Sequence, residues 1–365
     1  MRQRIAVAMS GGVDSSAAAA LLVEQGYDVF GITMKTHQID NAVPEKAGSS
    51  SCCSFSGIND ARMVAAQLGI PHHLVDVTAM FAEEVINDFV SEYLRGRTPN
   101  PCVGCNRKIK WEELLRQSMA LGAEAIATGH YASVRYDGSS ARWVLSRGRD
   151  ARKDQTYALW GLTQDSLGRT LFPLEGMTKE ETRQYVASRG LPVASKPESF
   201  EICFIPDNDY GRFLKVRVPD LEERVQGGEL RFNGETIGSH KGYPFFTIGQ
   251  RKGLGVAVGE PLYVTGIDAD ANRVELGRET DLHARGLLAG EVNMIKYSTL
   301  AGTMTVDAKV RYKDEGAPAR ARLRDDGRLE VLYDRPRRAI TPGQSVVLYE
   351  GDDVVGGGII DTVLR

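Results

Sequence analysis

The first half of the chain alternates short apolar runs with longer segments in which apolar residues recur at helical spacing. The apolar runs predict buried strands, and the longer amphipathic or alanine-rich segments predict helices. Strands that alternate with helices are typical of a parallel sheet covered by helices. The expected strands are residues 4–9, 27–34, 73–77 and 123–128, and the expected helices are residues 15–25, 57–68, 79–94 and 108–121.

The pattern changes near residue 200. From Gly227 onward, short β-branched runs are separated by Gly, Asn and Asp turns, which predicts antiparallel strands and a small barrel at the C-terminal end. We expect one domain boundary near residues 205–215 and another near 285. A polar, serine-rich stretch at residues 36–56 is expected to be a mobile flap. The expected antiparallel strands are residues 229–232, 263–268, 303–310, 319–324, 328–333 and 345–349.

Composition narrows the class of protein. A chain of 365 residues is long enough for two or three domains. It carries 45 Lys and Arg against 48 Asp and Glu, so nucleic-acid binding must come from local basic patches. No apolar run approaches the roughly 20 residues that span a bilayer. Five cysteines without a secretory signal favour thiol chemistry or metal ligation in a reducing compartment, and we expect a cytoplasmic protein with no membrane partner.

The loop from Ser10 to Ser16, SGGVDSS, directly follows the first expected strand and precedes the first expected helix. Glycines at this place let backbone N–H groups approach a phosphate, and the helix N-terminus adds positive potential. The loop lacks the Gly-Lys-Ser/Thr ending of a Walker motif. A glycine turn with a Ser or Asp N-cap is the alternative interpretation.

Cys102 and Cys105 form a Cys-x-x-Cys pair, which we expect on a turn that precedes a helix. Five basic and no acidic side chains lie in residues 95–110, and these surroundings favour a reactive thiolate. Cys203 stands far away in the apolar run 200–205. A zinc knuckle lacks two of its four ligands here. Inert thiols, and sulfur chemistry with Cys105 and Cys203 as partners, both remain open.

Eleven short segments, spread nearly from end to end of the chain, carry a resemblance to a known family. They are residues 10–16, 31–35, 96–101, 105–106, 127–131, 153–157, 201–205, 247–255, 310–312, 341–344 and 356–359. Taken in this order, they resemble the tRNA-specific 2-thiouridylases of the ATP pyrophosphatase (PP-loop) superfamily.

The resemblance implies an α/β fold with three domains. Residues 1–208 would form a parallel-sheet nucleotide-binding domain of the adenine nucleotide α-hydrolase type, residues 209–284 a small central domain, and residues 285–365 an antiparallel β-barrel. It also implies that ATP binds with Mg²⁺, which Asp14 would help to hold. The residues expected to contact ATP are Ala8, Met9, Ser10, Gly11, Gly12, Val13, Asp14, Ser15, Met34 and Gly129.

The implied reaction is ATP-dependent 2-thiolation of the wobble uridine of tRNA, at position 34. ATP would adenylate the C2 oxygen, and sulfur would then displace AMP. Cys105 would be the nucleophile and Cys203 the carrier of persulfide sulfur, with a Cys105–Cys203 disulfide formed in each cycle. Basic runs at 95–110 and 142–153 would hold phosphates. The residues expected to touch tRNA are Asn100, Pro101, Cys102, His130, Lys153, Asp154, Gln155, Arg311, Tyr312 and Gln344.

The chain departs from the family pattern at Cys102, where many members carry Asp. With this third thiol, Cys102, Cys105 and Cys203 are possible ligands of a [4Fe–4S] cluster, which would replace the persulfide route. The implied partners are tRNAs of the Lys, Glu and Gln types and a sulfur donor such as a cysteine desulfurase or a sulfur relay protein. An amide-forming ligase of the same superfamily and a non-catalytic RNA-binding protein are the alternatives. No role is assigned to Cys52 and Cys53.

Overall fold

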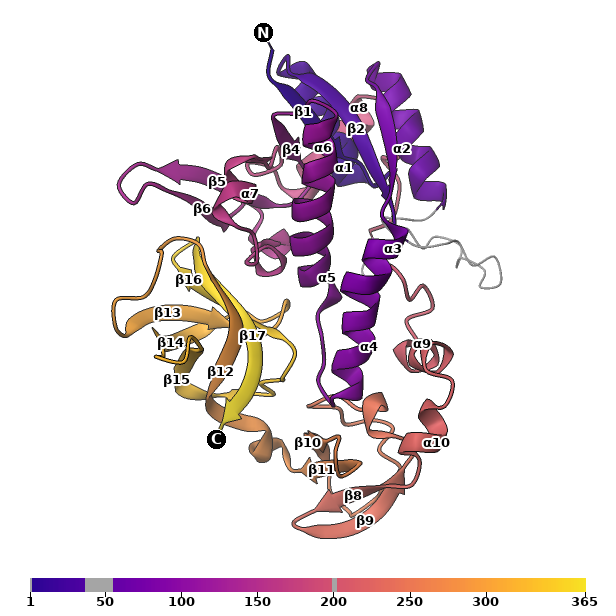
Figure 1. Ribbon diagram of the computed structural model, residues 1–365, viewed down its shortest axis with the longest axis vertical. Coiled ribbons are helices and arrows are strands. Elements are labelled where there is room, and N and C mark those ends of the chain that lie inside the picture. Colours follow the sequence, from indigo (N-terminus) through magenta and orange to yellow (C-terminus); the bar gives the residue numbers. More distant parts are fainter. Residues whose placement is uncertain (1, 37–54, 199–201) are drawn as a thin grey trace.

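The computed structural model describes residues 2–36, 55–198 and 202–365 (Figure 1). The polar stretch expected to be a flap lies almost wholly outside these residues. Among the described helices, none is long and apolar enough to cross a membrane.

A five-stranded parallel sheet forms the centre of the N-terminal domain, as the alternating pattern predicts. Its strand order is β3-β2-β1-β4-β7, with β1 flanked by β2 and β4 on either side. The short edge strand β7 was not expected, because two residues carry no readable pattern. The strands are β1 (Arg4–Ala8), β2 (Asp28–Lys35), β3 (His72–Asp76), β4 (Ala125–Ala127) and β7 (Thr170–Leu171).

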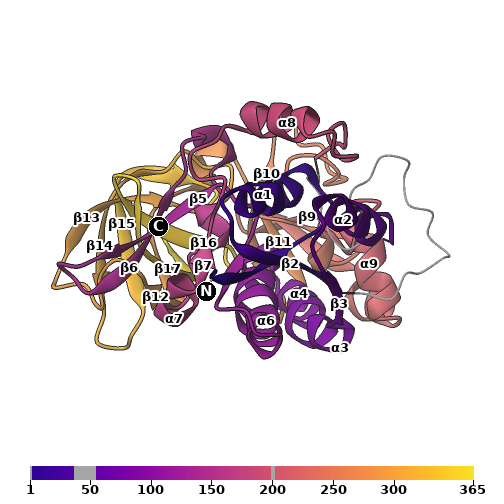
Figure 2. The same ribbon diagram turned by 90° about the horizontal axis from the view of Figure 1, so that it is seen from above.

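Helices cover both faces of this sheet, and each face has its own apolar core (Figure 2). One face is covered by α1 (Val13–Glu24), α2 (Phe55–Leu68) and α8 (Lys179–Ser188). Alanines of α1 allow it to lie close to the sheet, since Ala17, Ala18 and Ala19 are fully buried. The other face is covered by two long helical runs. The first comprises α3 (Thr78–Phe81), η1 (Ala82–Ile86) and α4 (Asn87–Leu94), and the second α5 (Pro101–Gly104), η2 (Cys105–Leu114) and α6 (Leu115–Ala120).

The prediction that the Cys-x-x-Cys pair lies on a turn before the helix was wrong. The helical run begins at Pro101, so both cysteines are part of it. Asn100 is the N-cap, and its side chain accepts a hydrogen bond from the Cys102 backbone N–H at 3.2 Å. A capping Asn followed by Pro at the first helical position is a strong signal for the start of a helix. Here the helix begins at Pro101 although Gly104 lies in its first turn.

An antiparallel hairpin leaves the N-terminal domain and joins the C-terminal barrel. It consists of β5 (Ala132–Asp137) and β6 (Arg142–Arg147), and Ser146 of β6 pairs with Asp353 of the barrel strand β17. The basic run expected to hold phosphates is therefore partly engaged within the protein. Arg142 donates to the backbone carbonyls of Met294 and Ile295 in the barrel. Short elements follow the hairpin: η3 (Ala151–Lys153), η4 (Thr156–Ala158) and α7 (Gln164–Gly168).

The central part of the chain forms a small four-stranded sheet with the order β10-β11-β8-β9. It lies at the far end of the long helices (Figure 1), where the Tyr243 hydroxyl donates to the Leu94 carbonyl at 2.6 Å. Its elements are α9 (Tyr210–Arg217), α10 (Leu221–Val225), β8 (Gly228–Phe232), β9 (Glu235–His240), η5 (Tyr243–Phe245), β10 (Tyr263–Asp268), β11 (Arg273–Gly277) and η6 (Glu279–Leu282).

A closed six-stranded antiparallel barrel forms the C-terminal end, which confirms the expected barrel. The order is β12-β15-β14-β13-β16-β17, and β12 pairs with β17 to close it. The two longest strands, β12 and β17, were not expected because glycines interrupt their apolar pattern. The strands are β12 (His283–Met294), β13 (Met304–Lys309), β14 (Ala317–Leu323), β15 (Leu329–Arg338), β16 (Ser345–Glu350) and β17 (Asp353–Leu364).

The barrel docks on the segment that leads to the cysteine pair. The Thr98 backbone N–H donates to the Pro342 carbonyl at 2.9 Å, and Gln344 Nε2 donates to the Thr98 carbonyl at 2.8 Å. Between these contacts lies Gly343 with φ of +90°, where an added Cβ would lie 2.9 Å from Thr98 backbone atoms. Only glycine fits this close approach.

We predict that Gly343→Ala lowers the thermal unfolding midpoint more than Gly351→Ala does. Both glycines have positive φ, but an added Cβ at Gly351 meets nothing within 4 Å. The left-handed conformation costs about 1–2 kcal/mol for an alanine at either place. Only Gly343→Ala adds the collision with Thr98. Equal midpoints for the two variants in differential scanning calorimetry would contradict the docking contact.

Candidate active site

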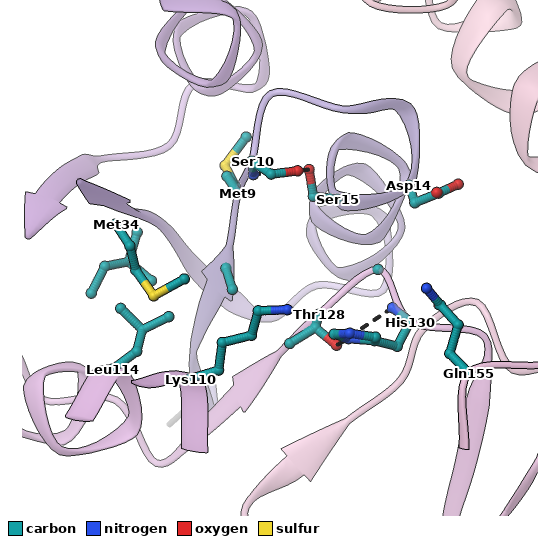
Figure 3. A pocket seen from close by; sticks show the side chains of 13 residues that line it. Met9, Ser10, Asp14, Ser15, Met34, Lys110, Leu114, Thr128, His130 and Gln155 are labelled. Atoms are coloured by element: carbon teal, nitrogen blue, oxygen red, sulfur yellow. Dashed lines mark hydrogen bonds between the residues drawn. The ribbon is translucent and has the colours of Figure 1, made fainter. Parts of the chain in front are cut away.

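A cavity of about 170 Å³ opens at the carboxyl ends of β1, β2 and β4 (Figure 3). In parallel sheets this edge is the usual place for a ligand. Serine, aspartate and backbone groups of the glycine loop line one side, and apolar side chains line another. The lining residues are Ala8, Met9, Ser10, Asp14, Ser15, Ile32, Met34, Lys110, Leu114, Thr128, Gly129, His130 and Gln155.

Seven of the ten residues expected to contact ATP line this cavity: Ala8, Met9, Ser10, Asp14, Ser15, Met34 and Gly129. Gly11, Gly12 and Val13 are absent from its lining: the two glycines form the turn after Ser10, and Val13 begins α1. Gly11 has φ of +68°, and an added Cβ would collide with the Gly57 carbonyl. The glycine loop is thus held against the start of α2.

Gly129, at the end of β4, approaches the glycine loop from the other side. An added Cβ would lie 2.5 Å from the Asp14 carbonyl carbon and 2.6 Å from the Ser15 nitrogen. The Ser15 hydroxyl accepts from the Ser10 backbone N–H at 3.2 Å and fixes the loop internally. These contacts hold Ser10, Ser15 and the N-terminus of α1 toward the cavity, an arrangement suited to phosphate groups.

The Asp14 carboxylate is held by two side chains. Lys179 Nζ lies 2.7 Å from both of its oxygens, and the Tyr131 hydroxyl donates to Oδ1 at 2.9 Å. Burial, followed by the nearby Asp14 charge, raises the pKa of Tyr131, so this phenol stays a donor. Among the described residues no group of three or more His, Cys, Asp or Glu side chains is placed to hold a metal ion. The site therefore fits Mg²⁺ only as an ion that takes most ligands from phosphates and water, with Asp14 alone from the protein.

His130 and Gln155 were expected at the tRNA, and the structure places both in the cavity wall. His130 Nδ1 lies 2.6 Å from the Thr128 hydroxyl, and its ring packs near Trp111. Burial, then the charge of Lys110, lowers the pKa of His130 well below 6.5, so the ring is neutral near neutral pH. Gln155 Oε1 accepts from the Tyr131 backbone N–H at 2.9 Å.

The three cysteines of interest differ in exposure: Cys102 is exposed, while Cys105 and Cys203 are partly buried. Cys105 and Cys203 both pack against the same apolar core, which includes Phe89 and Phe204. Cys105 is the first residue of η2, and the same segment supplies Lys110 to the cavity. This cluster is extensive and also includes residues of the small central sheet and of the barrel, such as Val264 and Val347.

The segment before Cys203 is tied to the glycine loop. Lys196 Nζ donates to the Gly11 carbonyl at 3.0 Å and to Asp60 at 2.5 Å. Two residues on, Glu198 accepts from Lys153 at 2.6 Å and lies 3.8 Å from Lys179, the partner of Asp14. These ion pairs connect the residues around the nucleotide cavity to the segment that precedes Cys203.

The remaining residues expected at the tRNA lie where the barrel meets the N-terminal domain. Tyr312 is 44% exposed. Partial desolvation of its hydroxyl raises its pKa, and the charges of Asp154, Cys102 and Glu198 add to this shift. Groups of both domains are therefore neighbours here. Asn100 is the helix N-cap beside Pro101, Arg311 donates to the Arg338 carbonyl at 3.5 Å, and Gln344 is bound to Thr98.

Asp154 is buried within the protein. Its Oδ2 lies 3.5 Å from Arg147 Nε and 3.6 Å from Lys309 Nζ, and only 4% of its side chain is exposed. Its Oδ1 accepts from the Thr156 hydroxyl at 2.6 Å. As placed here, its carboxylate joins the barrel to the N-terminal domain, while the neighbouring Lys153 remains nearer the surface.

Four cavity residues were missed by the sequence analysis: Ile32, Lys110, Leu114 and Thr128. Ile32 and Thr128 fall inside segments that carried the family resemblance, so their place in or directly after parallel strands was the available signal. Lys110 and Leu114 lie in a helical run whose pitch was not readable from apolar periodicity.

The glycine loop, its place after β1 and the cavity at the carboxyl edge of a parallel sheet define a nucleotide-binding enzyme of the PP-loop class. Three family models match the chain in succession. They are described as the tRNA methyl transferase HUP domain, over residues 3–207, the tRNA methyl transferase PRC-barrel domain, over 212–278, and the Aminomethyltransferase beta-barrel domain, over 284–360.

Curated relatives match almost the whole chain. The tRNA-specific 2-thiouridylase MnmA of Salinibacter ruber is 52% identical, covering 99% of this chain and 94% of its own. That of Cytophaga hutchinsonii is 51% identical, covering 99% and 98%. The chain belongs to the tRNA-specific 2-thiouridylase family.

A solved structure described as the U34-tRNA thiolase NcsA from Methanococcus maripaludis with its [4Fe-4S] cluster is more remote. It is 18% identical, with 60% of this chain and 67% of that chain covered and a TM-score of 0.35. A likeness of this degree does not transfer the cluster to the present chain.

We predict that His130→Asn changes the dependence of stability on pH. Because the folded protein disfavours protonated His130, the unfolded chain binds more protons below about pH 6.5, and wild-type stability falls as the pH decreases. His130→Asn lacks this pH-dependent loss. We therefore expect the difference between the melting midpoints of wild type and variant to be smaller at about pH 5 than at about pH 7.5, by ~2–4 °C for each kcal/mol of stability that the wild type loses. Phe172→Leu, which alters a neighbouring ring without a titrating group, is the control. A gap that is constant with pH for His130→Asn would contradict the buried neutral imidazole.

Proposed function

We propose that this protein catalyses ATP-dependent 2-thiolation of the wobble uridine of tRNA and releases AMP and pyrophosphate. The observation that carries the proposal is the placement of Cys105 at the start of the helical segment that also lines the nucleotide cavity. Relatives that are about half identical over nearly the full chain are named for this reaction.

We divide the chain into a nucleotide-binding catalytic domain of residues 1–208, a central domain of residues 209–284 and a barrel of residues 285–365. The three successive family matches support these limits to within a few residues. The two small β-domains then serve to bind and orient the RNA beside the catalytic domain.

In the first step, ATP occupies the cavity with its base against Met34 and its phosphates at the glycine loop, from Ser10 to Ser15. Gly11, Gly12 and Val13 shape the loop, and Ala8, Met9 and Gly129 complete the wall. Mg²⁺, when bound, neutralises phosphate charge, and Asp14 is the protein residue that would hold it. Holding the triphosphate beside a splayed-out uridine allows the C2 oxygen to attack the α-phosphorus and expel pyrophosphate.

In the second step, sulfur replaces the adenylated oxygen. Cys203 carries the sulfur as a persulfide, and the Cys105 thiolate attacks the Cys203 Sγ. This forms the Cys105–Cys203 disulfide and releases hydrosulfide, which adds to C2 as AMP leaves with the electron pair. A dithiol reductant then returns the disulfide to two thiols before the next cycle. Both thiols pack against one extended apolar cluster, which is compatible with this assignment.

The RNA lies over the junction of the barrel and the catalytic domain. Asn100, Pro101 and Cys102 surround the target base, and Lys153, Arg311 and Tyr312 contact the backbone or neighbouring bases. Asp154 and Gln344 serve this surface chiefly by joining the two domains, while His130 and Gln155 face the nucleotide. The neighbourhood of Tyr312 and Cys102 across the domain junction supports this surface.

The persulfide route is favoured over a [4Fe–4S] cluster. Cys102, Cys105 and Cys203 are all described, and no metal-holding group of three such residues is formed within the described part of the chain. The sulfur donor is a persulfide-carrying protein such as a cysteine desulfurase or a relay protein. We place the reaction in the cytoplasm, with tRNAs of the Lys, Glu and Gln types as substrates.

We predict that Cys105→Ser and Cys203→Ser each reduce formation of 2-thiouridine by about 10³-fold or more, because each removes a sulfur atom used in the transfer. Purified protein is incubated with unmodified tRNA, ATP, Mg²⁺ and a persulfide donor, and the wobble nucleoside is identified by mass spectrometry. A first turnover of pyrophosphate release persists in both variants, since adenylation uses neither thiol. Cys52→Ser, at a cysteine without an assigned role, is the control. Undiminished 2-thiouridine formation by the double variant would contradict sulfur transfer through these two cysteines, and absence of 2-thiouridine with the wild-type protein would favour an amide-forming ligase.

We also predict that protein prepared without iron retains its thiolation rate when a persulfide donor is supplied. Iron content and visible absorption are measured on the same samples, together with the Cys102→Asp variant, which restores the carboxylate found in many relatives. Thiolation that rises in proportion to bound iron, and disappears in Cys102→Asp, would contradict the persulfide route.

A further inference from the structure

Charge in the nucleotide cavity is unevenly distributed. Three of its lining residues can titrate: Asp14, Lys110 and His130. The Asp14 carboxylate is already bound by Lys179, and the lowered pKa of His130 keeps that ring neutral. Lys110 is therefore the single cationic side chain among the lining residues that the structure describes.

Lys110 extends its ammonium group toward the middle of the cavity, between the end formed by Met34 and Leu114 and the end formed by Ser10 and Ser15 (Figure 3). With the adenine base at the apolar end and the terminal phosphates at the glycine loop, this middle position corresponds to the α-phosphate. The α-phosphorus is the atom that uridine attacks in the proposed reaction.

A neutral neighbour orients this ammonium group. Lys110 Nζ donates to Asn106 Oδ1 at 2.8 Å, and Asn106 Nδ2 in turn donates to the Ala158 carbonyl at 2.9 Å. Asn106 is buried, so its side chain has little freedom. Across the described ranges, no carboxylate lies within ion-pair distance of Lys110. The full positive charge is thus available to a ligand.

Lys110 lies in the same helical segment as the thiol. This segment, from Cys105 to Leu114, is π-helical. Lys110 and Leu114 are four residues apart and both line the cavity, as expected for residues that share one face of a helix. Wide π-helical turns are frequent at functional sites.

We propose that Lys110 is a catalytic residue of the adenylation step, an assignment that rests on the proposed function. Its ammonium group donates hydrogen bonds to the non-bridging oxygens of the α-phosphate. As the uridine C2 oxygen bonds to the α-phosphorus, the bond to the bridging oxygen breaks and pyrophosphate leaves with the electron pair. The N3 proton of the uridine passes to water, and Lys110 stays protonated. A fixed cation aimed at developing negative charge stabilises a transition state more than a ground state.

The test measures ATP affinity and the first turnover of pyrophosphate separately. We expect Lys110→Met to slow pyrophosphate release by about 10²–10³-fold at saturating ATP and tRNA. Binding of a non-hydrolysable ATP analogue, measured by calorimetry, weakens about tenfold at most. Lys110→Arg restores part of the rate because it retains the charge. Arg116→Met removes an exposed cation from the same helical run, where Arg116 is bound to Glu113 rather than to the cavity, and keeps the wild-type rate.

The outcomes are distinguishable. Pyrophosphate release by Lys110→Met within threefold of wild type overturns the assignment to Lys110 but leaves the proposed function intact. A loss of analogue binding as large as the loss of rate makes Lys110 a binding residue and likewise overturns its catalytic role. If Lys110→Met does not fold, as judged by its melting curve, the nearly isosteric Lys110→Gln variant is measured by the same criteria. Absence of tRNA-dependent pyrophosphate release from wild-type protein would contradict the proposed function itself.

Discussion

The close approach of Gly129 to the backbone of Asp14 and Ser15 is the contact on which the site depends. It joins the end of β4 to the loop after β1, and no side chain fits between them. Because both segments follow parallel strands, their carboxyl ends meet at one edge and leave a cavity there. The same loop is held from the other side by Gly57 and by Lys196. The glycine loop therefore contacts both α2 and the segment before Cys203. A displacement of either is expected to affect nucleotide binding.

The barrel extends this constraint to the junction where we propose that the RNA binds. Its loop at Pro342–Gln344 pairs with Thr98, two residues before the helix cap Asn100. A second junction places Asp154 between Arg147 and Lys309, directly beside Gln155 in the cavity wall. Movement of the barrel would therefore disturb both the cysteine helix and the nucleotide cavity.

Much of this architecture follows from local sequence. The parallel strands and their helices are readable because buried runs and glycine turns repeat in order, and seven of ten expected nucleotide residues line the cavity. Other features depend on distant partners. Glycines interrupt the apolar pattern of β17, so the sequence did not predict this strand. The burial of Asp154 depends on Lys309, which belongs to another domain. Lys110 lines the cavity from η2, and nothing in the local sequence indicates which side of that helical segment faces the carboxyl edge of the sheet.

The central claim is that the nucleotide held at the glycine loop converts the uridine C2 oxygen into a leaving group. An anticodon stem-loop labelled with ¹⁸O at the C2 oxygen of the wobble uridine tests this directly. After one turnover with ATP and a persulfide donor, the account predicts that the ¹⁸O is found in the phosphate of AMP. Thiolated RNA accompanied by unlabelled AMP, with the ¹⁸O in water or pyrophosphate, would contradict it.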